Sequence, residues 1–81
     1  MKQLMYFTAA WCGPCRQLGP IMNEVANEVP VRKVDVDNEP NIAQQYGVRS
    51  VPTIVLVENG NEKERLVGVQ PKSSYIQLYN R

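Results

Sequence analysis

The sequence has no histidine, and only two cysteines, one tryptophan and one phenylalanine among its 81 residues. A mononuclear zinc site needs about four protein ligands, so the lack of histidine and of further cysteines excludes such a site within a single chain. Long apolar runs and blocks of like charge are also absent, which argues against a membrane span and a disordered tail. The formal net charge of +1 gives no reason to expect nucleic acid. We therefore expect no metal ion, no other cofactor, no nucleic acid and no membrane.

A chain of 81 residues is suited to one small domain, which we place at residues 1–81 and expect to be a monomer. A domain of this size buries roughly 60% of the surface of its unfolded chain. The first residues carry one lysine and no apolar segment of signal-peptide type, which favours a cytoplasmic protein. In that compartment a cysteine pair is more often catalytic or metal-binding than a static cross-link.

The N-terminal part of the sequence predicts a strand followed by a helix. Four consecutive apolar residues lie within Met1–Thr8, as in a short strand that is buried on both faces. After Pro14 the apolar residues recur at helical spacing, and Pro30 marks the end of this helix. Pro20 lies inside the helix and removes one backbone donor, so we expect a bend near residues 16–20. The apolar positions of the helix are Leu18, Ile21, Met22, Val25, Ala26 and Val29.

The middle of the sequence predicts a second strand and a short helix. Valines interspersed with charged residues in Val31–Asp37 favour a strand. Asn38 is placed to cap the helix that follows, and Gly47 is placed to end it in the left-handed conformation. The inner side of this helix is formed by Ile42, Ala43 and Tyr46.

The last part of the sequence predicts a β-hairpin and a final helix. Arg49–Pro52 forms a loop, Thr53–Val57 is the most β-branched run of the chain, and Asn59-Gly60 is a strong hairpin signal. We place the returning strand at Leu66–Val69 and the opening of the last helix at Pro71–Ser74. This helix covers one face of the sheet with Tyr75, Ile76, Leu78 and Tyr79.

These elements predict an α/β fold with the order β-α-β-α-β-β-α. The first two strands are joined through a helix and are expected to be parallel, with a right-handed crossover. The last two strands form an antiparallel hairpin. The predicted architecture is a four-stranded mixed sheet flanked by three helices.

Residues 9–16, with the sequence Ala-Ala-Trp-Cys-Gly-Pro-Cys-Arg, hold both cysteines and the only tryptophan. If this segment begins a helix, Cys12 and Cys15 lie on one face and can close into a disulfide. Cys12 then lies at the positive end of the helix dipole, where backbone N–H groups lower the pKa of its thiol. Its neighbours in sequence are neutral or cationic, because Arg16 follows and no acidic residue precedes Glu24.

We interpret the cysteine pair as a redox centre in which Cys12, reachable by water and substrate, attacks a disulfide and Cys15 resolves the mixed disulfide. Pro14 stiffens the first turn of the helix without the loss of a hydrogen bond, and Gly13 leaves the backbone open to a partner. A purely structural disulfide is the alternative. It would close a very short loop and therefore constrain little of the unfolded chain.

Several separate motifs together resemble the thioredoxin family over nearly the whole chain. They are Trp11-Cys12-Gly13-Pro14-Cys15 with the later Pro20, Val51-Pro52-Thr53, Asn59-Gly60 and Val67-Gly68. The resemblance implies the thioredoxin fold, dithiol-disulfide exchange, and a cis peptide bond between Val51 and Pro52. It also implies that the backbone of Val51 pairs with an extended substrate segment in a shallow apolar groove. The groove would be formed by Trp11, Gly13, Pro14, Val51, Pro52, Val67 and Gly68.

Other roles remain open for some of these residues. Trp11 can simply anchor its loop, Val67 can belong to the core, and Gly68 can serve backbone geometry alone.

The sequence departs from the thioredoxin pattern in two places. It lacks the strand and helix that usually precede the strand leading into the cysteines. Tyr6 stands where the family usually has a buried aspartate that assists proton transfer at the resolving cysteine, and Lys33 matches the lysine that accompanies it. A phenol with a reference pKa of about 10 is a poor base at neutral pH, so we expect Tyr6 mainly to fill the core.

The resemblance therefore implies a protein-disulfide reductase whose substrates include disulfide-containing proteins such as ribonucleotide reductase. Its electrons would come from thioredoxin reductase or from a small thiol. A glutaredoxin-like reductant recharged by glutathione is one alternative, suggested by the short chain, although the Cys-Pro-Tyr-Cys motif of glutaredoxins is absent. A redox-independent accessory subunit of a larger assembly is another.

Overall fold

The computed structural model describes residues 1–81 and confirms the predicted order of elements. No helix in it is long and apolar enough to cross a membrane. The strands form one four-stranded sheet in the order β2-β1-β3-β4, with β1 parallel to β2 and the other pairs antiparallel. The elements are β1 (Lys2–Thr8), α1 (Gly13–Ala26), β2 (Val31–Asp35), α2 (Pro40–Gln45), β3 (Thr53–Glu58), β4 (Asn61–Val67) and α3 (Lys72–Tyr79).

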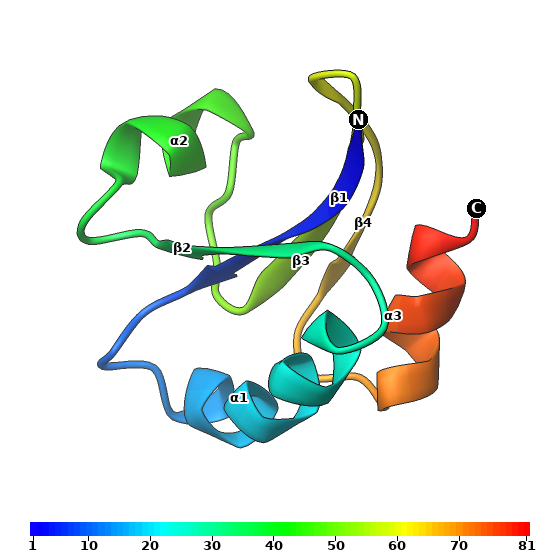
Figure 1. Ribbon diagram of the computed structural model, residues 1–81. Helices are drawn as coiled ribbons and strands as arrows, with labels where there is room; N and C mark the ends of the chain where they lie inside the picture. Colours follow the sequence, from blue (N-terminus) through cyan, green and yellow to red (C-terminus); the bar gives the residue numbers. More distant parts are fainter.

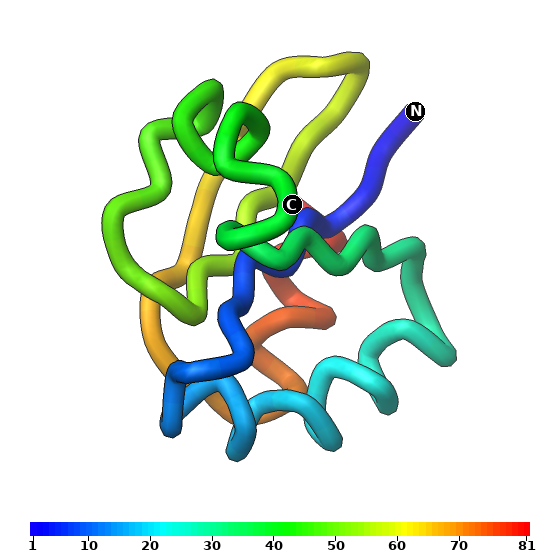
Figure 2. Tube along the Cα trace, turned by 90° about the vertical axis from the view of Figure 1, so that its left-hand side faces the viewer, coloured from blue at the N-terminus to red at the C-terminus, as the bar shows by residue number.

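The two central strands explain the apolar runs in the sequence. β1 and β3 have neighbouring strands on both sides and helices on both faces, so side chains on both faces of each strand are buried. On one face, α1 and α3 cover a cluster that includes Leu4, Leu18, Ile54 and Tyr75. On the other face, the smaller cluster lies under α2 (Figures 1 and 2). The sheet is therefore the middle of three layers.

One end of the sheet brings together segments that are far apart in the sequence. β1 leads into the cysteine loop after Thr8, and Thr8 is paired with Asp35 at the end of β2. The neighbouring Phe7 is paired with Thr53, the first residue of β3, and Thr53 is also paired with Val67 at the end of β4. The cysteine loop and the loops that flank β2, β3 and β4 therefore meet at this end.

The second strand is shorter than predicted. β2 ends at Asp35 rather than Asp37, because the Asp35 carboxylate accepts hydrogen bonds from the backbone N–H groups of Asp37 and Asn38 and turns the chain. The prediction that Asn38 caps α2 is consequently wrong. Glu39 occupies the N-cap position without a side-chain hydrogen bond, and Pro40 is the first helical residue.

The returning strand of the hairpin is also displaced from its predicted position. β4 begins at Asn61, directly after the Asn59-Gly60 turn, and ends at Val67 rather than Val69. The charged residues after the turn do not prevent pairing, because β4 is an edge strand and exposes much of its surface. A register shift between Leu56 and Val57 accommodates the extra residue on β4.

The helix boundaries follow the sequence more closely. α1 ends at Ala26, and a turn made by residues 27–29 leads to Pro30, so the stop lies earlier than predicted. The helix continues through Pro20, and the bend expected there stays a prediction. After α2, Gly47 has a φ of 62° as predicted. The N–H of Gly47 bonds to the carbonyl of Gln44 and that of Val48 to Ala43, which is the Schellman arrangement at a helix end.

Candidate functional site

The two cysteine sulfurs lie at the N-terminus of α1. Cys12 is the N-cap residue, and Cys12 and Cys15 are bonded as a disulfide with their Cα atoms 5.2 Å apart. The backbone N–H of Cys15 donates a hydrogen bond to Cys12 Sγ at 3.2 Å. The sulfur of Cys12 therefore takes the capping position predicted for it, where a backbone donor and the helix dipole both favour negative charge.

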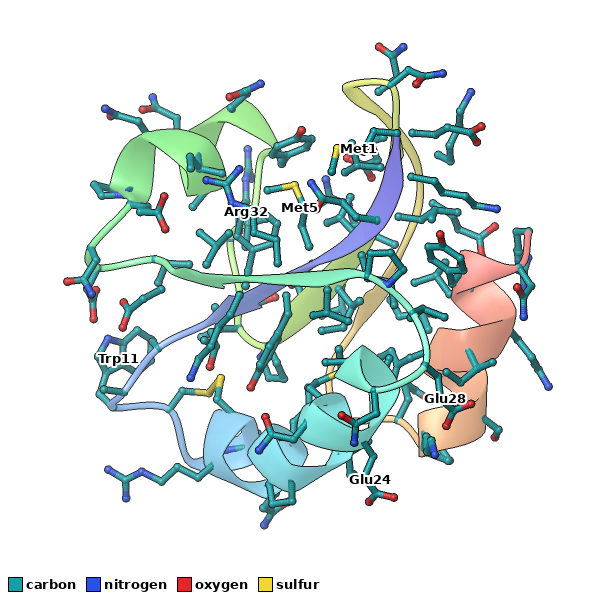
Figure 3. All side chains as sticks on the ribbon, in the orientation of Figure 1. Met1, Met5, Trp11, Glu24, Glu28 and Arg32 are labelled. Atoms are coloured by element: carbon teal, nitrogen blue, oxygen red, sulfur yellow. A yellow bond between two sulfur atoms is a disulfide. The ribbon has the colours of Figure 1, made fainter.

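Both cysteines are largely buried in this disulfide form. Cys12 is 4% and Cys15 3% exposed. The prediction that water and substrate reach Cys12 concerns the thiol of the reduced protein and stays a prediction. The burial is due to a small cluster in which Ala9, Val36 and Val51 cover the disulfide. Figure 3 shows the disulfide between the loop that carries Trp11 and the first turn of α1. A partner that reaches the sulfur must therefore approach through the residues at the edge of this cover.

The Val51-Pro52 loop forms one side of this cover. The peptide bond between the two residues is cis, as the resemblance implies. The carbonyl oxygen of Val51 lies 3.5 Å from Cys12 Sγ, and the carbonyl oxygen of Pro52 accepts a hydrogen bond of 2.9 Å from the N–H of Gly68. Thr53 fixes the same loop, since its hydroxyl donates to the carbonyl of Ser50 at 2.7 Å. This loop lies between Cys12 Sγ and the end of β4.

The predicted groove residues lie at this same end of the sheet. Trp11 is 67% and Val67 53% exposed, so Val67 is not a core residue. Gly13 and Pro14 are also exposed, Val51 is half-buried and Pro52 is buried. Four of these residues are exposed, namely Trp11, Gly13, Pro14 and Val67, so this part of the predicted groove is an open surface.

Trp11 is held by a residue that the sequence reasoning did not assign to the site. Its indole N–H donates a hydrogen bond of 2.8 Å to a carboxylate oxygen of Asp37. The backbone N–H of Asp37 in turn bonds to the side chain of Asp35 at 2.9 Å. The sequence does contain a signal for this contact. Because β1 and β2 are parallel neighbours, they end at the same edge of the sheet, and acidic residues after β2 therefore lie close to the loop after β1.

Tyr6, which departs from the family pattern, is buried in the structure, whereas Lys33, which matches it, is exposed. Tyr6 is 4% exposed and belongs to the core cluster under α1 and α3, and its hydroxyl donates to the backbone carbonyl of Cys15 at 3.3 Å. Lys33 is paired with Tyr6 in the β1–β2 register, but it is exposed and forms no ion pair. Tyr6 thus fills the core and also contacts the backbone of the second cysteine.

Arg16, the other cation predicted near the site, is hydrogen-bonded to the backbone of the cysteine loop. Arg16 is exposed and donates a hydrogen bond of 3.2 Å to the carbonyl of Ala10, which folds its side chain back over the residues before Trp11. The structure contains no group of three or more cysteine, aspartate or glutamate side chains placed to hold a metal ion.

Comparisons with known proteins agree with this geometry. The family model described as Thioredoxin matches residues 1–81. A thioredoxin of Rickettsia felis is 44% identical over 82 residues, which cover 96% of this chain and 78% of the relative. A thioredoxin of Chlamydia trachomatis is 44% identical over 81 residues, with 96% of this chain and 79% of the relative covered.

Solved structures show the same likeness in three dimensions. A mutant thioredoxin from Halobacterium salinarum NRC-1 has a TM-score of 0.90 and 40% identity, and the match covers 98% of this chain and 72% of that one. Thioredoxin NaTrxh from Nicotiana alata has a TM-score of 0.87 and 35% identity, with 95% and 69% covered. Since the family model spans the whole chain, and since thioredoxins resemble it in both sequence and fold, this chain belongs to the thioredoxin family, whose members are disulfide oxidoreductases.

Proposed function

We propose that this protein reduces protein disulfides, with Cys12 as the nucleophile and Cys15 as the resolving thiol. The observation that carries the proposal is the hydrogen bond from the Cys15 N–H to Cys12 Sγ at the N-cap of α1. In the reduced protein the same position stabilises a thiolate on Cys12 through the backbone donor and the helix dipole. Cys15 lies inside the first turn, within bonding distance of Cys12.

The exchange proceeds in two steps that conserve atoms and electrons. The Cys12 thiolate attacks one sulfur of the substrate disulfide, forms a mixed disulfide and releases the other substrate sulfur as a thiolate that takes up a proton. The Cys15 thiolate then attacks Cys12 Sγ, closes the Cys12–Cys15 disulfide and releases the second substrate thiol. Two electrons pass from the protein dithiol to the substrate.

The surface beside Cys12 supports binding of an extended, partly apolar substrate segment. Two exposed apolar side chains lie on this surface, Trp11 on the cysteine loop and Val67 at the end of β4, and the sheet register brings these segments together. Gly13 and Pro14 add exposed surface without long side chains, and Val51, Pro52 and Gly68 supply backbone. We assign the pairing with substrate backbone to Val51, which contacts Cys12 Sγ through its carbonyl.

Reduction of insulin disulfides tests the proposal directly. The chain has only two cysteines, so Cys15→Ser and Cys12→Ser each leave a single thiol whose adducts can be counted by mass spectrometry. We expect the wild-type protein to reduce insulin and both variants to fail. Cys15→Ser should accumulate a mixed disulfide with the substrate, whereas Cys12→Ser should form much less. Equal trapping by the two variants, or a wild-type protein that does not reduce insulin, contradicts the assignment.

The same experiment separates the alternatives. If the Cys12→Ser variant keeps the biological activity, the protein acts as a redox-independent accessory subunit. Supplying electrons either from a flavin-dependent thioredoxin reductase with NADPH or from glutathione with its reductase identifies the donor. Ribonucleotide reductase is a candidate substrate by family likeness. We further propose that residues 1–81 act as a single monomeric domain in the cytoplasm, where thiols are kept reduced.

A further inference from the structure

A buried tyrosine on the C-terminal helix holds the connection between β4 and α3. Tyr75 is fully buried, and its hydroxyl donates a hydrogen bond of 3.1 Å to the carbonyl of Gly68. The same oxygen accepts a hydrogen bond of 2.9 Å from the backbone N–H of Gln70. One phenol therefore satisfies two backbone groups on either side of Val69, a segment that belongs to no helix or strand.

The segment held by Tyr75 is also tied to the loop beside the attacking sulfur. Gly68 has a φ of 88°, a conformation that glycine adopts without strain, and its N–H donates to the carbonyl of Pro52 at 2.9 Å. The preceding Val51 places its carbonyl 3.5 Å from Cys12 Sγ. Contacts therefore run from Tyr75 in the core through Gly68 and the Val51-Pro52 loop to Cys12.

Two exposed valines lie on either side of Gly68. Together with Met1 and Trp11, Val67 and Val69 are the large apolar side chains most open to solvent. Val67 is placed by its pairing with Thr53 at the end of β4. Val69 lies between Gly68, which is bonded to Pro52 through its N–H and to Tyr75 through its carbonyl, and Gln70, so the hydroxyl of Tyr75 holds the backbone on both sides of Val69.

We propose that Tyr75 is a positioning residue for substrate: its hydroxyl holds the Gly68–Gln70 segment so that the surface beside Cys12 is ready to bind an extended protein segment. The inference rests on the proposed function. Without the hydroxyl, the carbonyl of Gly68 and the N–H of Gln70 lose their buried partner, while the aromatic ring still fills the core. The segment would then have to be ordered each time substrate binds, which weakens binding of long substrates.

The ionisation state of Tyr75 suits this role over the physiological range. Burial raises the pKa of the Tyr75 phenol above its ordinary value, the hydrogen bond from Gln70 opposes that shift, and the nearby Tyr6 adds to it. The hydroxyl thus stays protonated and can donate to Gly68 throughout neutral and mildly alkaline conditions.

Comparison of a protein disulfide with a small one tests the proposal in Tyr75→Phe. Insulin must occupy the surface beside Cys12, whereas 5,5′-dithiobis(2-nitrobenzoate) needs only to reach the sulfur. We expect KM for insulin to rise about threefold to tenfold with kcat within about twofold of wild type, since the variant loses binding rather than chemistry. The rate with the small disulfide should stay at the wild-type value.

Tyr79→Phe is the matched control, because it removes the hydroxyl of another tyrosine on the same helix. Tyr79 donates to the carbonyl of Lys2 at 3.4 Å, away from Gly68 and Gln70. KM for insulin should be unchanged in this variant. An unchanged KM in a folded Tyr75→Phe protein, or an equal rise in both variants, overturns the proposal.

A measurement on the wild-type protein covers the case in which Tyr75→Phe does not fold. The amide proton of Gln70 should exchange with solvent at least about tenfold more slowly than an unstructured amide, because it donates to a buried oxygen. Exchange at the unstructured rate overturns the proposal. A wild-type protein that reduces neither disulfide would instead refute the proposed function, so the two failures are distinguishable.

Discussion

The Tyr6 hydroxyl donates a hydrogen bond of 3.3 Å to the backbone carbonyl of Cys15. This contact connects a central strand of the sheet with the first turn of α1, beside the cysteine to which we assign the resolving role. A phenol is a hydrogen-bond donor here, not a base. We infer that deprotonation of Cys15 during resolution depends on water or on the departing sulfur of Cys12.

Tyr6→Asp should therefore introduce a new pH dependence into the resolution step. A carboxylate at this buried position supplies a proton acceptor near Cys15 that titrates within the range studied. Stopped-flow rates with a model disulfide, recorded from acid to alkaline pH, measure the effect. A profile identical to that of the wild-type protein contradicts the inference.

Tyr6→Phe is the companion variant for this test. It removes the hydrogen bond to Cys15 but introduces no acid, so the shape of the pH profile should be preserved. The free energy of unfolding should fall by about 1 kcal/mol, the net value of one hydrogen bond. A changed profile in Tyr6→Phe would show that the hydroxyl itself takes part in proton transfer.

The hydrogen bond between Trp11 and Asp37 predicts a measurable restriction of the indole. Trp11 is the only tryptophan, so its fluorescence reports this residue alone. Asp37→Ala removes the acceptor of the 2.8 Å hydrogen bond and should lower the fluorescence anisotropy of Trp11. Asp37→Asn keeps an acceptor oxygen and should remain close to the wild-type anisotropy. Equal anisotropy in Asp37→Ala and wild type would mean that the contact does not restrain the ring.

These contacts show why some parts of the structure were predictable from sequence and others were not. The apolar residues of β1, α1 and β3 are buried, and their spacing along the chain follows from that burial, so the local sequence pattern predicts these elements. The end of β2 is set instead by the Asp35 side chain, and the start of β4 by pairing across the hairpin. Local propensity does not report either interaction.

The same distinction applies to the site. Cys12 and Cys15 are close in sequence, and helix geometry alone predicted their contact and the capping position of Cys12. The cis bond before Pro52 followed only from the family resemblance, since the general frequency of such bonds is about 5%. The hydrogen bond of Trp11 to Asp37 spans 26 residues and depends on the register of β1 and β2.

The ion pair between Glu62 and Arg65 predicts part of the acid sensitivity of the fold. The hydrogen bond from Arg65 lowers the pKa of Glu62, with burial opposing this shift. Arg65 also donates to the carbonyl of Tyr46 after α2, so the pair connects β4 to that helix. Because the folded pKa is lower than the unfolded one, the contribution is present above about pH 4.3 and is lost as pH falls through the folded pKa.

Glu62→Gln should accordingly flatten the fall in stability on acidification. The expected difference is smaller than about 1 kcal/mol, because both side chains are partly exposed. Urea unfolding at a series of pH values from neutral to acid measures it, with the curves of variant and wild type converging at low pH. A constant difference across the series would assign the effect to something other than ionisation of Glu62.

We expect Tyr75 to make the free energy of unfolding depend on pH in the alkaline range. Burial is the largest cause that raises the pKa of its phenol, so the folded state holds the proton more tightly than the unfolded chain does. The stabilising contribution is present below the unfolded pKa of about 10 and is lost as pH rises through the folded value. Above about pH 10 the free energy of unfolding should therefore fall more steeply in the wild-type protein than in Tyr75→Phe. Urea unfolding at pH 7, where the phenol is neutral in both states, supplies the reference difference between the two proteins. If that difference does not narrow as the pH is raised, the pKa of Tyr75 is the same in the folded and unfolded states. The phenol would then not be held in a buried, hydrogen-bonded position by Gly68 and Gln70.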